Sequence, residues 1–377
     1  MTKKKILLVG DGNHQFITNY SKWINKYKSG QNYETDIISL TKILPFNYKY
    51  YSKTYEIKDT LYAKIKGIGK YYRLLQFKKL LANLPSYDYV HFHFFGKESH
   101  FISDFFSKKA NCKIIISIWG SDMYRNKSDS FILACKNAYL ITFANEESIE
   151  FFESKYSWTK GNIRLCRFGL EPLENLNRLN QSKDDCKIDL GLNSKKIALT
   201  IGYNMSAGQQ HIEILNQFEK KNILILKDEI ELIIPITYGG SKKYKQQLLT
   251  KLNELPFEYK IFDDYLSDND VAKLRKASDI MLQLQITDQF SGSMQEHLFA
   301  NNIVITGSWL PYQTLKDNNC WFLEVQNINE LKSLLPNIVS NYNSFLKKTT
   351  HNPLAINTLS SWNNNINSWI NLYKLEE

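Results

Sequence analysis

Short apolar runs alternate with amphipathic stretches along most of the 377-residue chain. The runs are rich in Ile, Leu and Val and contain few polar positions. Such runs are typical of strands covered by helices on both faces, and therefore of a parallel sheet with helical crossover connections. We predict strands over residues 5–10, 87–93, 113–119, 138–143, 196–202, 231–237, 259–262, 279–284 and 302–306.

The alternation is interrupted once, where Leu173–Lys187 is rich in Asn, Asp and Glu. We interpret this stretch as a linker followed by a surface segment. The chain is therefore expected to form two doubly wound α/β domains, of residues 1–175 and 176–355, which face each other across a cleft. Residues 356–377 carry an aromatic stripe, and we expect them to form a helix that packs back toward the N-terminal domain. Ligands of open α/β sheets bind at the carboxyl ends of the strands, so the chemistry is expected in those loops.

Positive charge is concentrated near the N-terminus. Residues 1–100 hold 17 Lys and Arg against seven Asp and Glu, which accounts for the whole net charge of +10. The segment 42–79 combines ten basic residues with two acidic ones and seven tyrosines. Aromatic residues among bases suit an anionic membrane surface, and a solvated basic helix is the alternative interpretation. No nucleic-acid-binding motif accompanies the segment, so we expect no nucleic-acid partner.

The five cysteines are odd in number, widely spaced and never arranged as Cys-x-x-Cys, which argues against a disulfide framework or a cysteine-rich zinc site. No apolar run approaches the roughly 20 residues of a membrane span. These features predict a cytoplasmic protein, and the basic segment predicts peripheral attachment to the inner face of the cell membrane.

A small-residue loop lies between a predicted strand and a predicted helix at Ser291-Gly292-Ser293. Backbone amides of such a loop suit a diphosphate, because they meet the positive end of the helix dipole. Glu296 follows in the first turns of the helix, where its carboxylate suits two vicinal ribose hydroxyls. Asp288 precedes the loop, so acidic residues flank it. The alternative is an ordinary strand, loop and helix with capping residues.

The spacing Asp288-x7-Glu296 resembles the E-x7-E donor motif of GT-B glycosyltransferases such as family 4. The segments Ser117–Tyr124, Ile201–Ile212 and Ile233–Gly240 are similar to glycosyltransferase family 56, and the resemblance spans roughly residues 85–320. It implies the GT-B fold with two Rossmann-like domains. Family 56 enzymes transfer 4-acetamido-4,6-dideoxygalactose from a dTDP-sugar to an undecaprenyl-diphosphate-linked saccharide of enterobacterial common antigen.

The resemblance also implies which residues bind the donor. In family 4 an Arg and a Lys after the glycine that matches Gly202 neutralise the diphosphate, but this chain has no base there. The phosphates are then expected to be held by backbone amides and small polar side chains, and the nucleotide base to lie near Phe262. The predicted donor-binding residues are Gly202, Asn204, Ser206, Tyr238, Gly239, Gly240, Phe262, Asp288, Ser291, Gly292, Ser293 and Glu296.

The first predicted strand ends in Asp11-Gly12-Asn13-His14, where inverting GT-B enzymes often carry a catalytic histidine. We predict His14 as general base and Asp122 as the carboxylate that orients it. The alternative is that each caps a helix. The predicted acceptor-binding residues are Gly12, Asn13, His93 and Arg167. Asp268-Asn269-Asp270 resembles a metal-binding D-x-D motif but precedes a helix pattern, so capping is simpler, and we expect neither a metal nor another cofactor.

The sequence therefore predicts a hexosyl- or acetamido-deoxyhexosyltransferase. Its expected partners are a nucleotide-sugar donor, a lipid-linked saccharide acceptor and the anionic membrane surface that meets residues 42–79. Such an enzyme would serve cell-envelope polysaccharide synthesis, including O-antigen. The alternatives are a GT-B-like nucleotide-sugar 2-epimerase and a non-catalytic nucleotide-sugar-binding protein.

Overall fold

The computed structural model describes residues 3–26, 33–56, 69–96, 98–120, 123, 128–156, 161–288 and 290–374. The predicted catalytic Asp122 and residues 57–68 of the basic segment lie outside these ranges. The chain divides into two compact units. We call Met1–Gly169 with Asn365–Glu377 the N-terminal unit, and Leu170–Asn364 the C-terminal unit.

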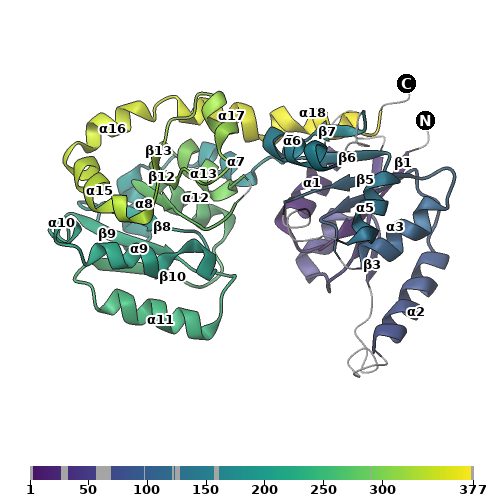
Figure 1. Ribbon diagram of the computed structural model, residues 1–377, viewed down its shortest axis with the longest axis horizontal. Helices are drawn as coiled ribbons and strands as arrows, with labels where there is room; N and C mark the ends of the chain where they lie inside the picture. The colour runs from purple at the N-terminus through teal and green to yellow at the C-terminus, as the bar shows by residue number, and fades with distance from the viewer. Residues whose placement is uncertain are drawn as a thin grey trace. The chain divides into compact units, whose positions relative to one another are not determined.

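The N-terminal unit contains a seven-stranded sheet in the order β3-β2-β1-β4-β5-β6-β7, with every neighbouring pair parallel. Its strands are β1 (Lys4–Gly10), β2 (Tyr33–Ser39), β3 (Thr54–Glu56), β4 (Tyr89–His93), β5 (Lys113–Ser117), β6 (Leu140–Phe143) and β7 (Ile163–Leu165). Its helices include α1 (Gln15–Lys26), η2 (Pro45–Tyr50), α2 (Gly69–Ala82), α3 (Ser99–Ser107), α5 (Asp129–Lys136) and α6 (Glu146–Lys155), which connect the strands (Figure 1).

The C-terminal unit repeats this plan with a six-stranded sheet in the order β10-β9-β8-β11-β12-β13, again fully parallel. Its strands are β8 (Ile197–Ile201), β9 (Ile230–Pro235), β10 (Glu258–Phe262), β11 (Ile280–Gln283), β12 (Ile303–Gly307) and β13 (Leu323–Val325). Its helices are α7 (Glu171–Arg178), α8 (Lys183–Asp189), η4 (Ala207–Gln209), α9 (His211–Phe218), α10 (Lys221–Leu224), α11 (Lys242–Asn253), α12 (Asp268–Ala277), α13 (Gly292–Phe299), α14 (Gln313–Asp317), η5 (Ile328–Glu330), α15 (Leu331–Ser340), α16 (Tyr342–Lys348) and α17 (Asn352–Ser360).

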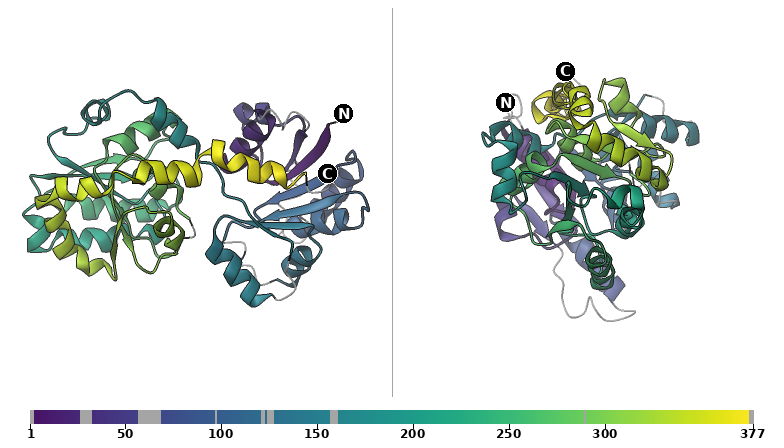
Figure 2. Two further views of the ribbon diagram at one scale, coloured as in Figure 1. Left: turned by 90° about the horizontal axis from the view of Figure 1, so that it is seen from above. Right: turned by 90° about the vertical axis from the view of Figure 1, so that its left-hand side faces the viewer.

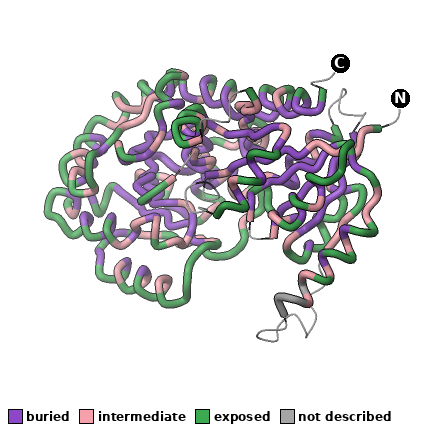
Figure 3. Tube along the Cα trace, turned by 45° about the vertical axis from the view of Figure 1, so that its right-hand side comes forward, coloured by how far each residue is buried: buried purple, intermediate pink, exposed green. Residues whose placement is uncertain are grey.

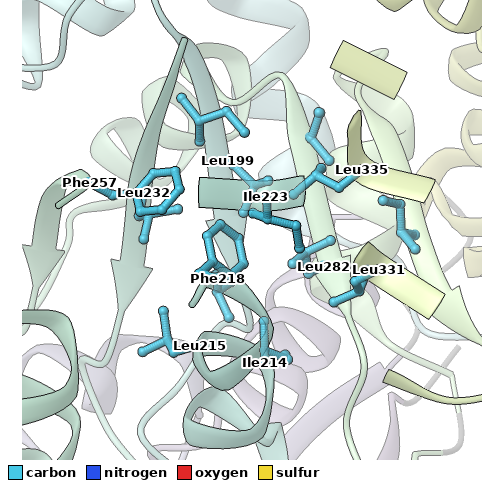
Figure 4. Close-up of a cluster of buried hydrophobic side chains, with 14 of the residues drawn as sticks. Leu199, Ile214, Leu215, Phe218, Ile223, Leu232, Phe257, Leu282, Leu331 and Leu335 are labelled. Atoms are coloured by element: carbon cyan, nitrogen blue, oxygen red, sulfur yellow. The ribbon is translucent and has the colours of Figure 1, made fainter. Parts of the chain in front are cut away.

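Every predicted strand is present within a few residues of its expected ends, which confirms the parallel α/β architecture. The central strands of both sheets are buried on both faces, while exposure is concentrated in the edge strands, helices and loops (Figure 3). In the C-terminal unit, Leu199 and Leu232 pack against Phe218 of α9 and Leu335 of α15 (Figure 4). Ala198, the residue just before Leu199 in β8, instead packs in a second cluster with Cys186 of α8, on the opposite face. This period of two across a strand places one layer of helices on each face.

The end of the chain forms two helices, α17 and α18 (Trp362–Asn371), rather than one. From Asn365 onward the chain belongs to the N-terminal unit, as the aromatic stripe predicted. The yellow helix α18 lies along this unit near the two chain ends (Figure 2), and Trp369 and Tyr373 are fully buried there. The Trp369 indole N–H donates to the Arg167 carbonyl oxygen at 2.8 Å, and the Tyr373 hydroxyl lies 2.6 Å from Nδ1 of His91. These buried polar contacts specify where α18 docks on the sheet.

The prediction of a linker at Leu173–Lys187 is wrong. The segment contains α7 and α8, in which Leu173 and Cys186 are completely buried. The many Asn and Asp residues occupy the exposed sides, caps and turns of two short helices, so composition alone concealed their buried faces. The C-terminal unit accordingly begins at Leu170.

A buried ionic cluster fixes α8 to this unit. The carboxylate of Asp279 accepts hydrogen bonds from Lys183 and Tyr342, both at 2.8 Å, and pairs with Lys187 at 2.6 Å. Burial by itself raises the pKa of Asp279, but the two ammonium groups outweigh it and hold that pKa below its usual value. The cluster therefore joins α8 and α16 to the start of β11.

Replacement of Asp279 by alanine should strongly destabilise the protein, because two largely buried ammonium groups lose their counter-charge. Breaking one side of a buried ion pair costs about 3–5 kcal/mol. The free energy of unfolding, measured by urea denaturation, should fall by about the lower end of this range, since Lys183 keeps some solvent access. Asp189→Ala, which breaks a more exposed pair with Lys273, is the control and should change little. Equal losses in the two variants would contradict the assignment.

Candidate functional site

Three loops meet at the carboxyl edge of the C-terminal sheet, because β9, β8 and β11 are neighbouring parallel strands. The loop after β8 is joined to the loop after β9 by the Met205 amide, which donates to the Tyr238 carbonyl at 2.6 Å. It is joined to the loop after β11 by the Ile286 amide, which donates to the Gly208 carbonyl at 2.9 Å. The structure thus brings the predicted donor-binding segments of all three loops together.

Gly202 begins the loop after β8 in a left-handed conformation, with φ of +63°. A Cβ at this position would lie 2.9 Å from the side-chain oxygen of Gln209 and 3.0 Å from Nε2 of His211. The position therefore requires glycine both for its backbone angle and for space.

The predicted polar ligands of this loop also stabilise its turns. The side-chain oxygen of Asn204 accepts the amide of Ser206 at 2.8 Å, and the hydroxyl oxygen of Ser206 accepts the amide of Gly208 at 3.3 Å. Across from them, Tyr238, Gly239 and Gly240 are exposed after β9. Asn204 and Ser206 thus shape the loop, since each accepts one of its backbone amides.

The loop after β11 leads into α13 as predicted. The hydroxyl oxygen of Ser291 caps the helix by accepting the amide of Met294 at 3.1 Å. Gly292 and Ser293 form the first turn, whose N–H groups have no preceding intrahelical acceptor. The Ser293 hydroxyl is buried and has no hydrogen-bond partner within the described chain. This arrangement presents polar donors at the start of α13.

Glu296 is 8% exposed and forms an ion pair with Arg275 of α12, whose Nε donates to Oε2 at 2.8 Å. Its other oxygen, Oε1, accepts no hydrogen bond from the described part of the chain. No motif in the sequence marks Arg275 as part of the site. The pair orients Glu296 and leaves one carboxylate oxygen available to a ligand.

The two remaining donor-side predictions are Asp288, within the loop after β11, and Phe262, at the end of β10. Asp288 accepts a hydrogen bond from the Tyr312 hydroxyl at 2.5 Å, so it is tied to the segment that follows β12. Phe262 ends β10 and packs, partly buried, beside Leu266 against the face of the sheet that carries α8. Of the two, only Asp288 belongs to the loop that leads into α13.

In the N-terminal unit, His14 lies at the carboxyl end of β1 and precedes α1. Its Nδ1 accepts the Phe16 amide at 3.3 Å, so it caps the helix, as the alternative interpretation held. Its ring lies against Trp119 with 4.7 Å between centroids, and against Phe16 with 5.3 Å. Although the residue is solvent-accessible, the protein around the ring desolvates it and lowers the pKa of His14 below its usual value, while Asp11 acts in the opposite direction. The imidazole is therefore neutral at neutral pH.

Two predicted acceptor-binding residues next to His14 hold the following loop in place. The side-chain oxygen of Asn13 accepts the Leu44 amide at 2.7 Å, and its Nδ2 donates to the Lys42 carbonyl at 2.8 Å. The amide of Gly12 donates to the Ser39 hydroxyl at 3.0 Å, in a buried position. Asn13 therefore positions the segment that begins at Lys42, while Gly12 is tied to the end of β2.

The other two predicted acceptor residues differ in accessibility. His93 is completely buried, and its ring stacks on His91 with centroids 4.2 Å apart. Neither ring nitrogen of His93 has a hydrogen-bond partner in the described chain. Arg167 pairs with Glu146 at 2.6 Å, so its charge is compensated. His93 thus lies beneath the strand-end surface, while Arg167 lies at its side.

An aromatic group that the sequence analysis missed covers His93. Phe16 stacks on Phe168 with centroids 5.0 Å apart and 12° between the ring planes. Trp119 lies edge-on to both, at 5.6 Å from each. All three are partly exposed, and they come from α1 and from the segments after β5 and β7. Because they converge only in the folded sheet, no sequence motif identifies them together. They form an apolar surface beside His14.

The D-x-D-like segment is the start of a helix. Asp268 and Asp270 lie in the first turn of α12, and the Ser267 hydroxyl oxygen caps it by accepting the Asp270 amide at 3.2 Å. No group of His, Cys, Asp and Glu suited to a metal ion occurs among the described residues.

Comparison with known proteins supports the fold. The sequence model of a family described as Glycosyl transferase 4-like matches residues 5–150. A glycosyltransferase from Rickettsia africae ESF-5 is 15% identical, with 100% of this chain and 99% of that chain covered and a TM-score of 0.75. Sucrose-phosphate synthase from Thermosynechococcus elongatus is 13% identical, with 99% of each chain covered and a TM-score of 0.74.

Anabaena HepE in complex with UDP and glucose is 12% identical, with 98% of this chain and 100% of that chain covered and a TM-score of 0.74. No curated protein sequence matches the chain. At these identities the likeness shows the fold. The two parallel-sheet units therefore have the GT-B fold, as the sequence predicted.

Glu296→Ala should destabilise the protein, because it leaves the buried Arg275 guanidinium without a counter-charge. The expected loss is about 3–5 kcal/mol in the free energy of unfolding. Glu296→Gln keeps an oxygen that accepts the Arg275 Nε–H and should lose less. Combining Glu296→Ala with Arg275→Met should restore much of the stability. If a double-mutant cycle by urea denaturation shows no coupling between the two positions, the ion pair does not act as described.

Proposed function

We propose that the chain is a glycosyltransferase that moves a sugar from a nucleotide-sugar donor to a saccharide acceptor. The observation that carries this proposal is the carboxylate of Glu296, oriented by Arg275 with Oε1 available, next to the amides that open α13. The GT-B fold and the family similarity over residues 5–150 support it. We assign the donor to the C-terminal unit and the acceptor to the N-terminal unit.

In this proposal each donor group meets a chemically matched part of the loops. Oε1 of Glu296 accepts a ribose hydroxyl, because a carboxylate is an acceptor only. The amides of the first turn of α13 bind the diphosphate and stabilise its charge as it leaves. Asp288 contacts the transferred sugar. No metal or other cofactor is required, since the backbone donors perform the neutralisation.

His14 is proposed as the base that removes the proton from the acceptor hydroxyl as its oxygen bonds to the anomeric carbon. The hydrogen bond from the Phe16 amide to Nδ1 favours the tautomer that is protonated at Nε2. For Nε2 to accept the proton, Nδ1 must carry the hydrogen and donate it to another acceptor. We propose Asp122 for this role, as in the sequence analysis. The aromatic surface of Phe16, Trp119 and Phe168 provides an apolar face for the acceptor.

We propose a lipid-linked acceptor, as in cell-envelope polysaccharide and O-antigen synthesis, and the surface of the segment after β2 supports it. Leu44 is 47% and Phe46 61% exposed, and exposed Lys42, Lys49 and Lys53 accompany them. Exposed apolar side chains beside bases suit the headgroup region of an anionic membrane. Asn13 holds this segment next to His14. Among the described residues, no helix combines the length and the apolar character that crossing a bilayer requires.

Nucleotide binding is the direct test of the donor site. UDP is the first ligand to assay, because HepE was solved with UDP and with UDP-glucose. A ligand at 100 times its dissociation constant stabilises the native state by about 2.7 kcal/mol, so the correct nucleotide should raise the melting temperature clearly. Glu296→Gln should weaken binding at least about tenfold, which is about 1.4 kcal/mol. Glu254→Gln, an exposed carboxylate after α11, is the control.

If no nucleotide or nucleotide-sugar raises the melting temperature, the donor site is wrongly assigned. If a nucleotide-sugar is epimerised without any acceptor, the activity is that of an epimerase. Transfer of radiolabelled sugar to a lipid-linked saccharide supports the proposal.

The pH profile tests His14. Only neutral imidazole accepts a proton, so kcat/KM should fall as pH falls through the His14 pKa. Because that pKa is lowered, the acid limb should lie below the usual histidine value of about 6.5. His14→Ala should reduce kcat about 10²–10⁴-fold and abolish this limb. His100→Ala, in which the lost ring packs against Phe101, is the control. An unchanged acid limb in His14→Ala would exclude it as the base.

Charge removal tests the membrane contact. Replacing Lys64, Lys66, Lys70, Arg73, Lys78 and Lys79 with glutamine should weaken binding to anionic liposomes, at about 1 kcal/mol for each base that lies near the surface. The nucleotide should still bind. A variant with the same charge change on the C-terminal unit should bind liposomes as the wild type does. Its six exposed positions are Lys195, Lys220, Lys221, Lys227, Lys332 and Lys347. Equal weakening in both variants would reveal only a net-charge effect.

A further inference from the structure

The C-terminal unit has a hollow of about 590 Å³ that the proposed donor site does not use. It lies between the start of α9 and the turns that follow β11, β12 and β13. Helix α9 contributes Ile214 and Phe218 to the core on its own face of the sheet, together with α15. Helix α13, which carries Glu296, instead packs with α7, α12 and α17. The hollow and Glu296 are therefore attached to helices on opposite faces of the sheet.

Trp309 forms an anchored aromatic wall of this hollow. Its indole N–H donates to the Gln285 carbonyl at 2.9 Å, so the edge of the ring is fixed. The ring packs across Gly307 so closely that a Cβ there would lie 2.3 Å from a ring carbon. The residue nevertheless remains 39% exposed. An indole that is held at its edge and packed against backbone, with exposed ring surface, is a preformed stacking platform.

Side-chain amides supply the polar groups around this platform. The Asn216 amide, Nε2 of Gln326 and Nδ2 of Asn329 have no partner in the described part of the chain. Two of these side chains are held in place through their amide oxygens. The Ser308 hydroxyl donates to Oε1 of Gln326 at 2.9 Å, and Nε2 of Gln217 donates to Oδ1 of Asn329 at 3.1 Å. Amides both donate and accept without charge. Glu213 is the only ionisable residue among those that line the hollow, and no basic residue lines it.

This chemistry selects a neutral saccharide. A pyranose ring has an apolar C–H face, which stacks on an aromatic ring, and a rim of hydroxyls, which hydrogen-bond to amides. A phosphate or carboxylate would find no cation and would meet Glu213 instead. The hollow is also large enough for a few sugar rings, since ligand pockets commonly measure about 300–1,000 Å³.

We infer that the hollow beside Trp309 is a second carbohydrate-binding site, which holds a neutral glycan segment apart from Glu296, on the side of the sheet that carries α9. The inference goes beyond the proposed function and does not rest on it, because the site is defined by its own residues. If the chain does transfer sugar, the site would retain a long acceptor or product.

The test uses the full chain labelled with 5-fluorotryptophan and followed by ¹⁹F NMR. The chain has seven tryptophans, and Trp309→Phe identifies the Trp309 signal. The probes are maltotriose, mannotriose, globotriose and triacetylchitotriose, added without nucleotide. At least one should shift the Trp309 signal saturably, with a dissociation constant of about 1 mM or below. Asn216→Ala should weaken that binding at least fivefold, and Trp321→Phe, which removes an indole elsewhere in the same unit, should not change it.

Three results would overturn the inference. The first is that no probe shifts the signal. The second is that UDP or a sialylated trisaccharide shifts it as strongly as the neutral probes, since the site would then not select neutral glycans. The third is that Trp309→Ala, checked for folding by its melting temperature, retains saccharide affinity measured by calorimetry. UDP binding to the same samples is recorded separately, so failure of the donor site cannot be confused with failure of this one.

Discussion

The organisation of this protein follows from the burial of two fully parallel sheets. A parallel strand covered on both faces has no exposed side for polar chemistry, so its functional groups must lie where the strand ends. The neighbouring strands β9, β8 and β11 end at one edge, and this alone brings together Tyr238, Gly202 and Asp288. Backbone hydrogen bonds between the loops then fix their shape. The candidate donor site is a consequence of strand order more than of any single motif.

The same burial determines how charge is used. Glu296 and Asp279 are both nearly buried, and each is retained with cationic partners. For Asp279 the carboxylate accepts from lysines, a tyrosine and a backbone amide, so it holds elements together and has no oxygen to spare. For Glu296 one oxygen meets Arg275 and the other accepts nothing from the described chain. Asp279 and Glu296 are similarly buried, but only Glu296 has a carboxylate oxygen that can still accept a hydrogen bond. Asp279 is therefore a structural group, and Glu296 is a candidate ligand-binding group.

The sequence predicted the architecture well wherever strands are continuous apolar runs, because burial on both faces imposes that composition. It missed the short strands β3, β7 and β13, and it missed β2, in which Thr35 and Asp36 are buried polar residues. They are accommodated because Asp36 accepts from the Tyr87 hydroxyl at 2.6 Å and Thr35 lies 2.6 Å from the Ser21 hydroxyl. Because each hydrogen-bond partner lies outside β2, the local sequence pattern gives no sign that these two polar residues can be buried.

The same reason limits the prediction of the site. A histidine that follows a strand and precedes a helix has the same local sequence pattern whether it caps the helix or acts as a base. Only the hydrogen bond from the Phe16 amide to Nδ1 shows that His14 caps α1. Because this bond occupies Nδ1, the proposed role of His14 as a base depends on Asp122 accepting a hydrogen bond from Nδ1 instead. Likewise, Arg275 lies 21 residues before Glu296, beyond any local motif, although it decides how that carboxylate is oriented.

The strand-end surface of the N-terminal unit contrasts with that of the C-terminal unit and is harder to explain by stability alone. His93 is buried with neither ring nitrogen paired, and an unpaired buried polar group costs about 1–3 kcal/mol. Burial also lowers the pKa of His93 to about 3, so its ring is neutral. Phe16, Trp119 and Phe168 above it remain partly exposed, although apolar rings gain by being covered. A core shaped only for folding would fill the His93 position with an apolar side chain. Natural proteins depart from such rules chiefly at functional sites, and both departures here lie at the edge where the acceptor is proposed to bind.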